Sequence, residues 1–255
     1  MINSTLPRLV AVVVTMSLAA CGGGSGGGLL PPDPPTAQPS NAGGVWEGTI
    51  SDTVAGTTAN IAGAVTEANT EARFLTEDGV ALVLENVSGN DGNLVADLVA
   101  FAPPGAVFSD GTSVSNGTLT GRVVERSSLT GDWTLATGDS GTVSLSYDAG
   151  LHQRASSLDF TAGIWLDAVN VIYTVDANGV LFGQDFIGCV YNGQVNLIDT
   201  RFNVYDLSIT VTSCPGANGT YEGLGVLADE FGVDDAFIVQ LDNGAFAIAD
   251  ILLRP

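Results

Sequence analysis

The chain of 255 residues contains no lysine and only one histidine. Its seven basic residues are all arginines, whereas 28 residues are aspartate or glutamate, and the formal net charge is −21 at pH 7. Proteins that bind nucleic acid contact its phosphates through Lys and Arg, so this charge balance argues against a nucleic-acid partner. The absence of lysine also excludes Schiff-base catalysis and lysine-assisted serine chemistry.

The strong acidity leaves two readings of the surface open. Mutual repulsion of carboxylates keeps a protein soluble in a salty medium, and an acidic surface also attracts a cationic partner or metal ions. The apolar residues make up 45% of the chain, which is ordinary for a folded protein. We therefore expect a folded body rather than a disordered acidic chain.

Catalytic motifs are scarce in this sequence. Residues 138–141 (Gly-Asp-Ser-Gly) resemble the surroundings of the nucleophile in trypsin-like serine proteases, but those enzymes need a histidine that precedes the serine, and His152 follows it. We predict a hairpin turn at 138–141 and a packing or solvated role for His152. A glycosidase needs only two carboxylates, yet with 28 available no pair stands out. The sequence therefore favours a protein that is not an enzyme.

The N-terminus has the three parts of an export signal. Arg8 is followed by an apolar run from Leu9 to Leu18, which is too short to span a bilayer comfortably, and small residues precede Cys21. Residues 18–21 (Leu-Ala-Ala-Cys) resemble the lipobox of bacterial lipoproteins. That resemblance implies a signal peptide at 1–20 and a diacylglyceryl thioether with an N-acyl group on Cys21, although a plain cleaved signal or a membrane anchor is the alternative.

The same resemblance implies a location. Gly22 stands where an inner-membrane retention signal would have Asp, so the sorting rule of lipoproteins favours the outer membrane, on its periplasmic side or at the cell surface. Residues 21–43 are rich in glycine and then in proline, which is typical of a flexible and extended linker. A coil of about 20 residues spans on the order of 25 Å, enough to hold a folded body away from the lipid headgroups.

Beyond the linker, the pattern indicates β-structure throughout. Apolar and polar residues alternate over 205–212 and 142–147, and shorter alternations occur at 171–175 and 237–241. Asn-Gly or Asp-Gly pairs favour the positive φ angles of tight hairpin turns. Eight such pairs begin at Asp78, Asp91, Asp110, Asn116, Asn178, Asn192, Asn218 and Asn243. We predict an all-β, antiparallel, up-and-down fold.

The tryptophans divide this body into two halves. All three lie in a Gly-x-Trp motif, which ends at Trp46, Trp133 and Trp165. The motif resembles the first strand of the calycin group, which includes the lipocalins, and this resemblance implies eight-stranded barrels that a tryptophan closes at one end. A tryptophan buried beside a strand glycine is the alternative. We predict one barrel-like domain at 44–150 and a second at 151–255, a layout that also resembles bacterial envelope lipoproteins with paired β-domains.

The second half has features of its own. Twelve of the eighteen aromatic residues follow Tyr147, which predicts a denser core there. Cys189 and Cys214 are the only cysteines besides Cys21, and in an exported protein they are most simply a disulfide. A metal-binding or redox pair is the alternative, although no Cys-x-x-Cys spacing occurs.

One loop of the second half gathers carboxylates. Asp229, Glu230, Asp234 and Asp235 surround an apolar segment just before the strand expected at 237–241. Loops rich in oxygen ligands can bind calcium, but this spacing does not match the known calcium-loop motifs, and a solvated turn is the alternative.

These observations lead to two functional hypotheses. The first is a non-catalytic structural or interaction role in the cell envelope, with the lipid anchor at the membrane and an envelope protein as partner. The second is a binding module that holds a small apolar ligand or a cation in the second barrel, beside Trp165 and Tyr173, because an eight-stranded barrel is just wide enough to enclose one small molecule.

Overall fold

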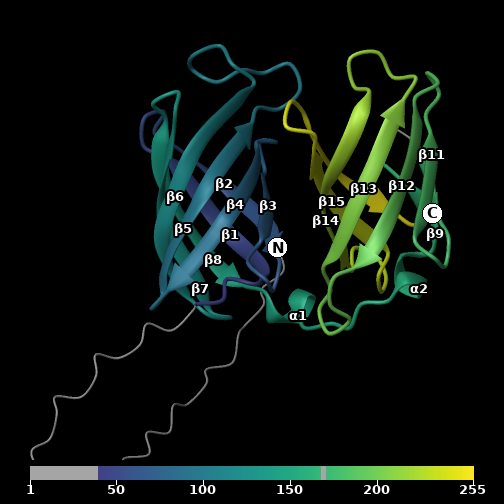
Figure 1. Ribbon diagram of the computed structural model, residues 1–255, viewed down its shortest axis with the longest axis horizontal. Coiled ribbons are helices and arrows are strands. Elements are labelled where there is room, and N and C mark those ends of the chain that lie inside the picture. The colour runs from purple at the N-terminus through teal and green to yellow at the C-terminus, as the bar shows by residue number, and fades with distance from the viewer. Residues whose placement is uncertain (1–39, 168–170) are drawn as a thin grey trace, which may run out of the picture. The chain divides into compact units, whose positions relative to one another are not determined.

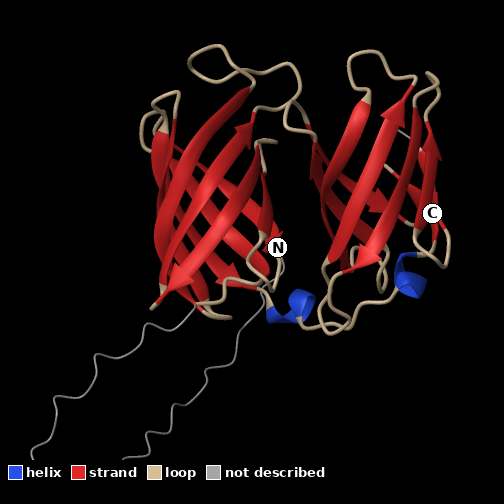
Figure 2. Cartoon of the chain, in the orientation of Figure 1, coloured by secondary structure: helices blue, strands red, loops and turns tan. Residues whose placement is uncertain are grey.

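The computed structural model describes residues 40–167 and 171–255, and it consists of two closed β-barrels (Figure 1). The predicted signal peptide, Cys21 and the linker up to residue 39 lie outside the described residues. Strands make up nearly all of the regular structure, and the helices are two single turns (Figure 2). The prediction of an all-β fold with two antiparallel barrels of eight strands each is confirmed.

The first barrel is an up-and-down meander in which each strand pairs with the next and β1 pairs with β8 to close the sheet. Closure leaves no free sheet edge, so each strand pairs with a neighbour on both sides. Its strands are β1 (Gly44–Asp52), β2 (Thr57–Val65), β3 (Glu71–Thr76), β4 (Ala81–Asn90), β5 (Asn93–Phe101), β6 (Val114–Val124), β7 (Ser128–Leu135) and β8 (Ser140–Tyr147).

The second barrel repeats this order, and β9 closes it by pairing with both β10 and β16. Two helical turns, α1 (Ala149–His152) and α2 (Leu158–Thr161), lie in the connection between the barrels. The strands are β9 (Gly163–Leu166), β10 (Ile172–Val175), β11 (Val180–Gln184), β12 (Val190–Leu197), β13 (Tyr205–Thr212), β14 (Gly219–Ala228), β15 (Ala236–Asp242) and β16 (Ala247–Leu253).

The alternating pattern of the sequence places the cores inside the barrels. In β13, Tyr205, Leu207, Ile209 and Val211 are buried, while the polar residues between them are half-buried or exposed. This is the two-residue period of a strand whose one face is covered. The strands expected at 142–147, 171–175 and 237–241 correspond to β8, β10 and β15.

Two of the eight Asn-Gly and Asp-Gly pairs do not lie at turns. Gly117 lies inside β6 and Gly193 inside β12, so the prediction that each pair marks a turn is wrong for these two. A Cβ at Gly117 would lie 2.0 Å from the carbonyl oxygen of Thr134, and one at Gly193 would lie 2.4 Å from that of Ser208. Glycine is needed there because neighbouring strands approach closely, not because of a positive φ.

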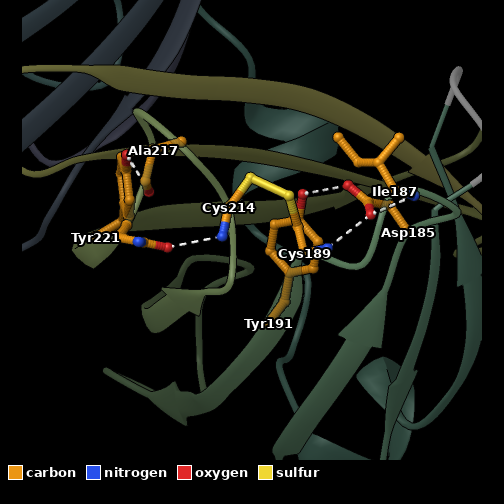
Figure 3. Close-up of a disulfide and its surroundings, with 8 residues drawn as sticks. Asp185, Ile187, Cys189, Tyr191, Cys214, Ala217 and Tyr221 are labelled. Atoms are coloured by element: carbon orange, nitrogen blue, oxygen red, sulfur yellow. Dashed lines mark hydrogen bonds between the residues drawn. A yellow bond between two sulfur atoms is a disulfide. The ribbon is translucent and has the colours of Figure 1, made fainter.

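Cys189 and Cys214 form a disulfide between the ends of β12 and β13, as the sequence predicts (Figure 3). The two residues are 25 positions apart. In the chain-entropy model, closing such a loop stabilises the fold by roughly 3 kcal/mol.

The prediction of a dense aromatic core in the second barrel is correct only in part. Aromatic side chains do fill its centre, where Trp165, Tyr173, Tyr205, Tyr221 and Phe237 are buried together. Five further phenylalanines of this half are instead exposed, because they lie on turns, on α2 or on outward strand positions; they are Phe160, Phe182, Phe186, Phe231 and Phe246.

Candidate functional site

The first barrel encloses a cavity of about 150 Å³. Its walls are aliphatic and aromatic side chains from all eight strands. Most of these side chains belong to the hydrophobic core of this barrel. The apolar wall residues are Ile50, Ala59, Ile61, Phe74, Val80, Leu82, Leu84, Leu98, Ala100, Phe108, Leu119, Leu129, Trp133, Leu135, Val143 and Leu145. An apolar cavity of this volume is the size at which proteins bind a benzene-like molecule.

Polar residues line this cavity at one end of the barrel, which we call the mouth. Three of them are carboxylates at the hairpins that connect β1 to β2, β3 to β4 and β7 to β8, namely Asp52, Asp78 and Asp139. Thr57 and Thr76 lie beside them. Asp52 and Thr57 are register partners at the tip of their hairpin, so both close the same end of the sheet.

The opposite end of the barrel is closed. Trp46 of β1 is fully buried there, and its indole Nε1 donates a hydrogen bond to the Ala42 carbonyl oxygen at 2.9 Å. Ser40 lies at the same end, where its backbone N–H donates to Gly89 and its hydroxyl accepts from the backbone N–H of Gly92. The chain therefore enters the first barrel at the closed end, and the mouth lies at the other.

Trp133 of β7 is a wall residue with an unusual hydrogen-bonding state. It is 8% exposed, and its Nε1 is buried without an acceptor among the residues that the structure describes. The other two tryptophans each donate to the carbonyl oxygen four residues earlier, Trp46 to Ala42 and Trp165 to Thr161. A buried donor without a partner costs on the order of 1–3 kcal/mol, so an acceptor that pairs with the Trp133 N–H would stabilise the folded protein.

The sequence expects the ligand in the second barrel, whereas this cavity lies in the first. Trp165 and Tyr173 are neighbours on β9 and β10, and both are buried in the second core. Tyr173 packs edge-on against Tyr191, and Trp165 packs against Phe237 and beneath the guanidinium of Arg254. Large rings occupy this interior, while the first barrel has small residues such as Ala59 and Ala100 on its inner wall.

Titratable groups in the second barrel are perturbed by burial. Desolvation raises the pKa of Asp250 on β16 to about 6 and raises the pKa of Tyr173 above its ordinary value, and the nearby carboxylate of Asp167 adds to both shifts. Neither group belongs to the cavity of the first barrel.

The acidic loop expected to bind calcium has partners of its own. Arg154 forms ion pairs with Asp229 and Asp234, and Asp229 also accepts from the backbone N–H of Asp234. Asp235 accepts from the backbone N–H groups of Glu230 and Phe231, and these hydrogen bonds lower its pKa. Within the described residues, Asp229, Asp234 and Asp235 therefore already pair with an arginine or accept hydrogen bonds from backbone N–H groups. Glu230 takes part in this network only through its backbone N–H.

A second group with metal-ligand chemistry consists of Asp185, Cys189 and Cys214. Both sulfurs belong to the disulfide, so neither is available as a thiolate. Asp185 instead accepts from the backbone N–H groups of Ile187 and Cys189, which shapes the turn beside the disulfide (Figure 3).

His152 packs in a fully buried position at the end of α1. Its ring stacks on Phe202 with the centroids 4.6 Å apart, and its Nδ1 lies 2.7 Å from the Tyr147 hydroxyl. Burial, helped by the nearby Arg126 guanidinium, lowers the pKa of His152 to about 4. Of the two roles that the sequence left open, the structure shows packing.

Sequence reasoning missed most of the candidate site. Trp133 was noted for its Gly-x-Trp motif, and Asp78 and Asp139 only as parts of turns, whereas Asp52 carried no signal. The sequence does contain a signal that could have found the three mouth carboxylates. Each lies at or next to the end of a strand, and in an up-and-down barrel their three hairpins lie at the same end.

Comparisons of the chain with protein-family models, with curated proteins and with solved structures give no match. Among the described residues there is no helix with the length and hydrophobicity needed to cross a bilayer.

Proposed function

We propose that this protein is a non-catalytic binding module of the cell envelope, held at the outer membrane by lipid on Cys21, whose first barrel encloses a small apolar ligand. The observation that carries the proposal is the apolar cavity of about 150 Å³ with the unpaired Nε1–H of Trp133 in its wall. Ligand pockets combine apolar walls with a few polar groups that orient the bound molecule.

The volume limits the ligand to about the size of a benzene ring. A bound molecule that carries an acceptor atom would pair the Trp133 N–H and remove the cost of an unsatisfied donor. The polar groups at the mouth would then contact the end of the ligand that remains near water.

The described part of the chain begins with Ser40, which contacts the first barrel at its closed end, opposite the mouth. The proposed lipid anchor itself rests on the lipobox-like sequence at residues 18–21.

Binding can be measured by calorimetry with benzene as the probe, using the full chain in lipid nanodiscs with empty nanodiscs as the blank. We expect heat of binding from the wild type, because small apolar molecules often enter preformed apolar cavities with favourable enthalpy. Ala100→Leu adds three carbon atoms to the cavity wall, and we expect it to weaken binding by at least about tenfold, or about 1.4 kcal/mol.

The matched control is Ala177→Leu, which makes the same change at an exposed turn between β10 and β11. It should bind benzene like the wild type. Absence of binding in the wild type, or equal binding by Ala100→Leu, would contradict the proposal.

Anchoring through Cys21 has a separate test. Two or more acyl chains give stable membrane attachment, so replacing the acceptor sulfur in Cys21→Ser should move the protein from the membrane fraction to the soluble fraction. Cell fractionation with immunodetection measures this, and a variant that stays in the membrane fraction would contradict lipid anchoring.

A structural or interaction role is the second candidate, and it is favoured by exposed apolar side chains on loops of the second barrel. Phe231 and Val233 lie in the loop between β14 and β15 and are 85% and 80% exposed, and neighbouring exposed apolar residues of this kind mark contact sites. Phe186, which is 88% exposed, lies in the loop between β11 and β12 at the other end of the barrel. This role would remain if the cavity binds no small molecule.

A further inference from the structure

We infer that the first barrel selects a cationic ligand, a small molecule with an apolar body and a positively charged amine. This inference rests on the proposed function and adds the charge of the ligand. It is carried by three carboxylates that line the cavity at the mouth, Asp52, Asp78 and Asp139, together with the buried unpaired N–H of Trp133 in the same wall, where Trp133 and Asp52 are both register partners of Gly141.

The three carboxylates have hydrogen-bond donors but no cation. Asp52 accepts from the backbone N–H groups of Val54 and Ala55, and Asp78 accepts from the Thr76 hydroxyl. Asp139 accepts from the hydroxyls of Ser109 and Thr137. None of the ion pairs among the described residues involves these three side chains.

The arginines of the first barrel do not line the cavity. Arg73 of β3 is buried in ion pairs with Glu71 and Asp242, at 2.9 and 3.0 Å. Arg126 pairs with Glu67 at the turn after β6, and Arg122 lies beside Gly92 at the closed end. With no lysine in the chain, the charged side chains that line the mouth are all negative, and a cationic ligand would supply the positive charge that pairs with them.

The inner and outer parts of the cavity would recognise different parts of one molecule. The aliphatic wall takes the apolar body, since burial of apolar surface is favourable by roughly 25 cal/mol per Å². The mouth takes the ammonium group, which can donate hydrogen bonds to carboxylates while it stays close to water. A carboxylate on the ligand would meet like charges and be repelled, so the sign of the charge sets the selectivity.

The test compares three probes that share one ring and differ in charge: benzylammonium, benzyl alcohol and benzoate. Each is titrated by calorimetry into the full chain in zwitterionic nanodiscs at low salt. We expect benzylammonium to bind at least about tenfold more tightly than benzyl alcohol, and benzoate at least about tenfold more weakly. The preference for the amine should shrink at about 0.5 M salt, because salt screens exposed charges.

Two triple variants of equal charge separate the mouth from the net charge of the protein. The mouth variant carries Asp52→Asn, Asp78→Asn and Asp139→Asn, in which the amide oxygen can still accept the turn hydrogen bonds. The control variant carries Glu85→Gln, Glu125→Gln and Asp132→Asn at exposed positions of the same barrel. We expect the mouth variant to bind amine and alcohol equally and the control variant to keep the wild-type preference.

The outcomes distinguish the two proposals. If none of the three probes binds the wild type, the proposed function fails and the inference fails with it. If benzyl alcohol binds the wild type as tightly as benzylammonium, or if the control variant loses the preference as much as the mouth variant does, the charge selection is wrong and ligand binding stands.

Discussion

At the residue scale, three tryptophans in the same Gly-x-Trp motif have two different environments. Trp46 and Trp165 are fully buried, and each donates to a carbonyl oxygen four positions earlier. Trp133 lies on β7 in the wall of a cavity, and its N–H has no partner in the described part of the chain. The Gly-x-Trp motif therefore predicts that the indole ring is buried. Whether the indole N–H is paired depends on whether a backbone carbonyl oxygen lies next to it.

The single histidine gives a pH-dependent prediction. The pKa of His152 is lowered to about 4 in the fold, against an ordinary value of 6.5, so the unfolded chain binds a proton more readily between these values. Stability should therefore fall as the pH drops from about 6.5 to 4, by up to about 3 kcal/mol from this group. Denaturant unfolding of the wild type and of His152→Gln, measured between pH 4 and 7, checks this.

The stability difference between the two proteins isolates the histidine contribution, since His152 is the only histidine of the chain. Asp250 acts in the opposite direction, because burial raises its pKa from 3.8 to about 6 in the fold. Its protonation makes the folded protein more stable as the pH falls through this range. Because Asp250 is present in both proteins, its effect cancels in the difference between them. We expect the advantage of the wild type over His152→Gln to shrink as the pH falls. A difference that stays constant across this range would show that the histidine is not held neutral by burial.

At the scale of elements, the strands were predictable because their two-residue period is a local property of the sequence. The alternations at 205–212 and 142–147 correspond to β13 and β8. The disulfide was predictable for another reason, since two cysteines behind an export-like signal sequence are most simply a disulfide.

Features that depend on distant neighbours were not predictable in this way. Gly117 and Gly193 follow asparagine as turn glycines do, and only the approach of the adjacent strand shows why they are glycines. The sequence also predicts that the exposed phenylalanines belong to the core. Only the structure shows that they lie on loops, on α2 or on outward strand positions. The cavity depends on the sum of many side-chain volumes around a closed sheet, so the aromatic content of the two halves did not indicate that the first barrel has it.

At the scale of the whole molecule, the two barrels share a topology and differ in their interiors. The second has large rings at its centre and a disulfide between neighbouring strand ends. The first has a smaller aromatic content, a cavity and an acidic mouth at the end opposite the entering chain. In the proposed function, the first barrel is the part that binds the ligand.

The most direct test of this account is fluorine NMR of the full chain labelled with 5-fluorotryptophan, titrated with benzene. The chain has three tryptophans, and Trp133→Phe assigns the signal of the cavity wall. We predict that the Trp133 signal shifts on saturation while those of Trp46 and Trp165 stay in place. No shift of any signal, or a shift of Trp165 with Trp133 unchanged, would contradict a ligand site in the first barrel.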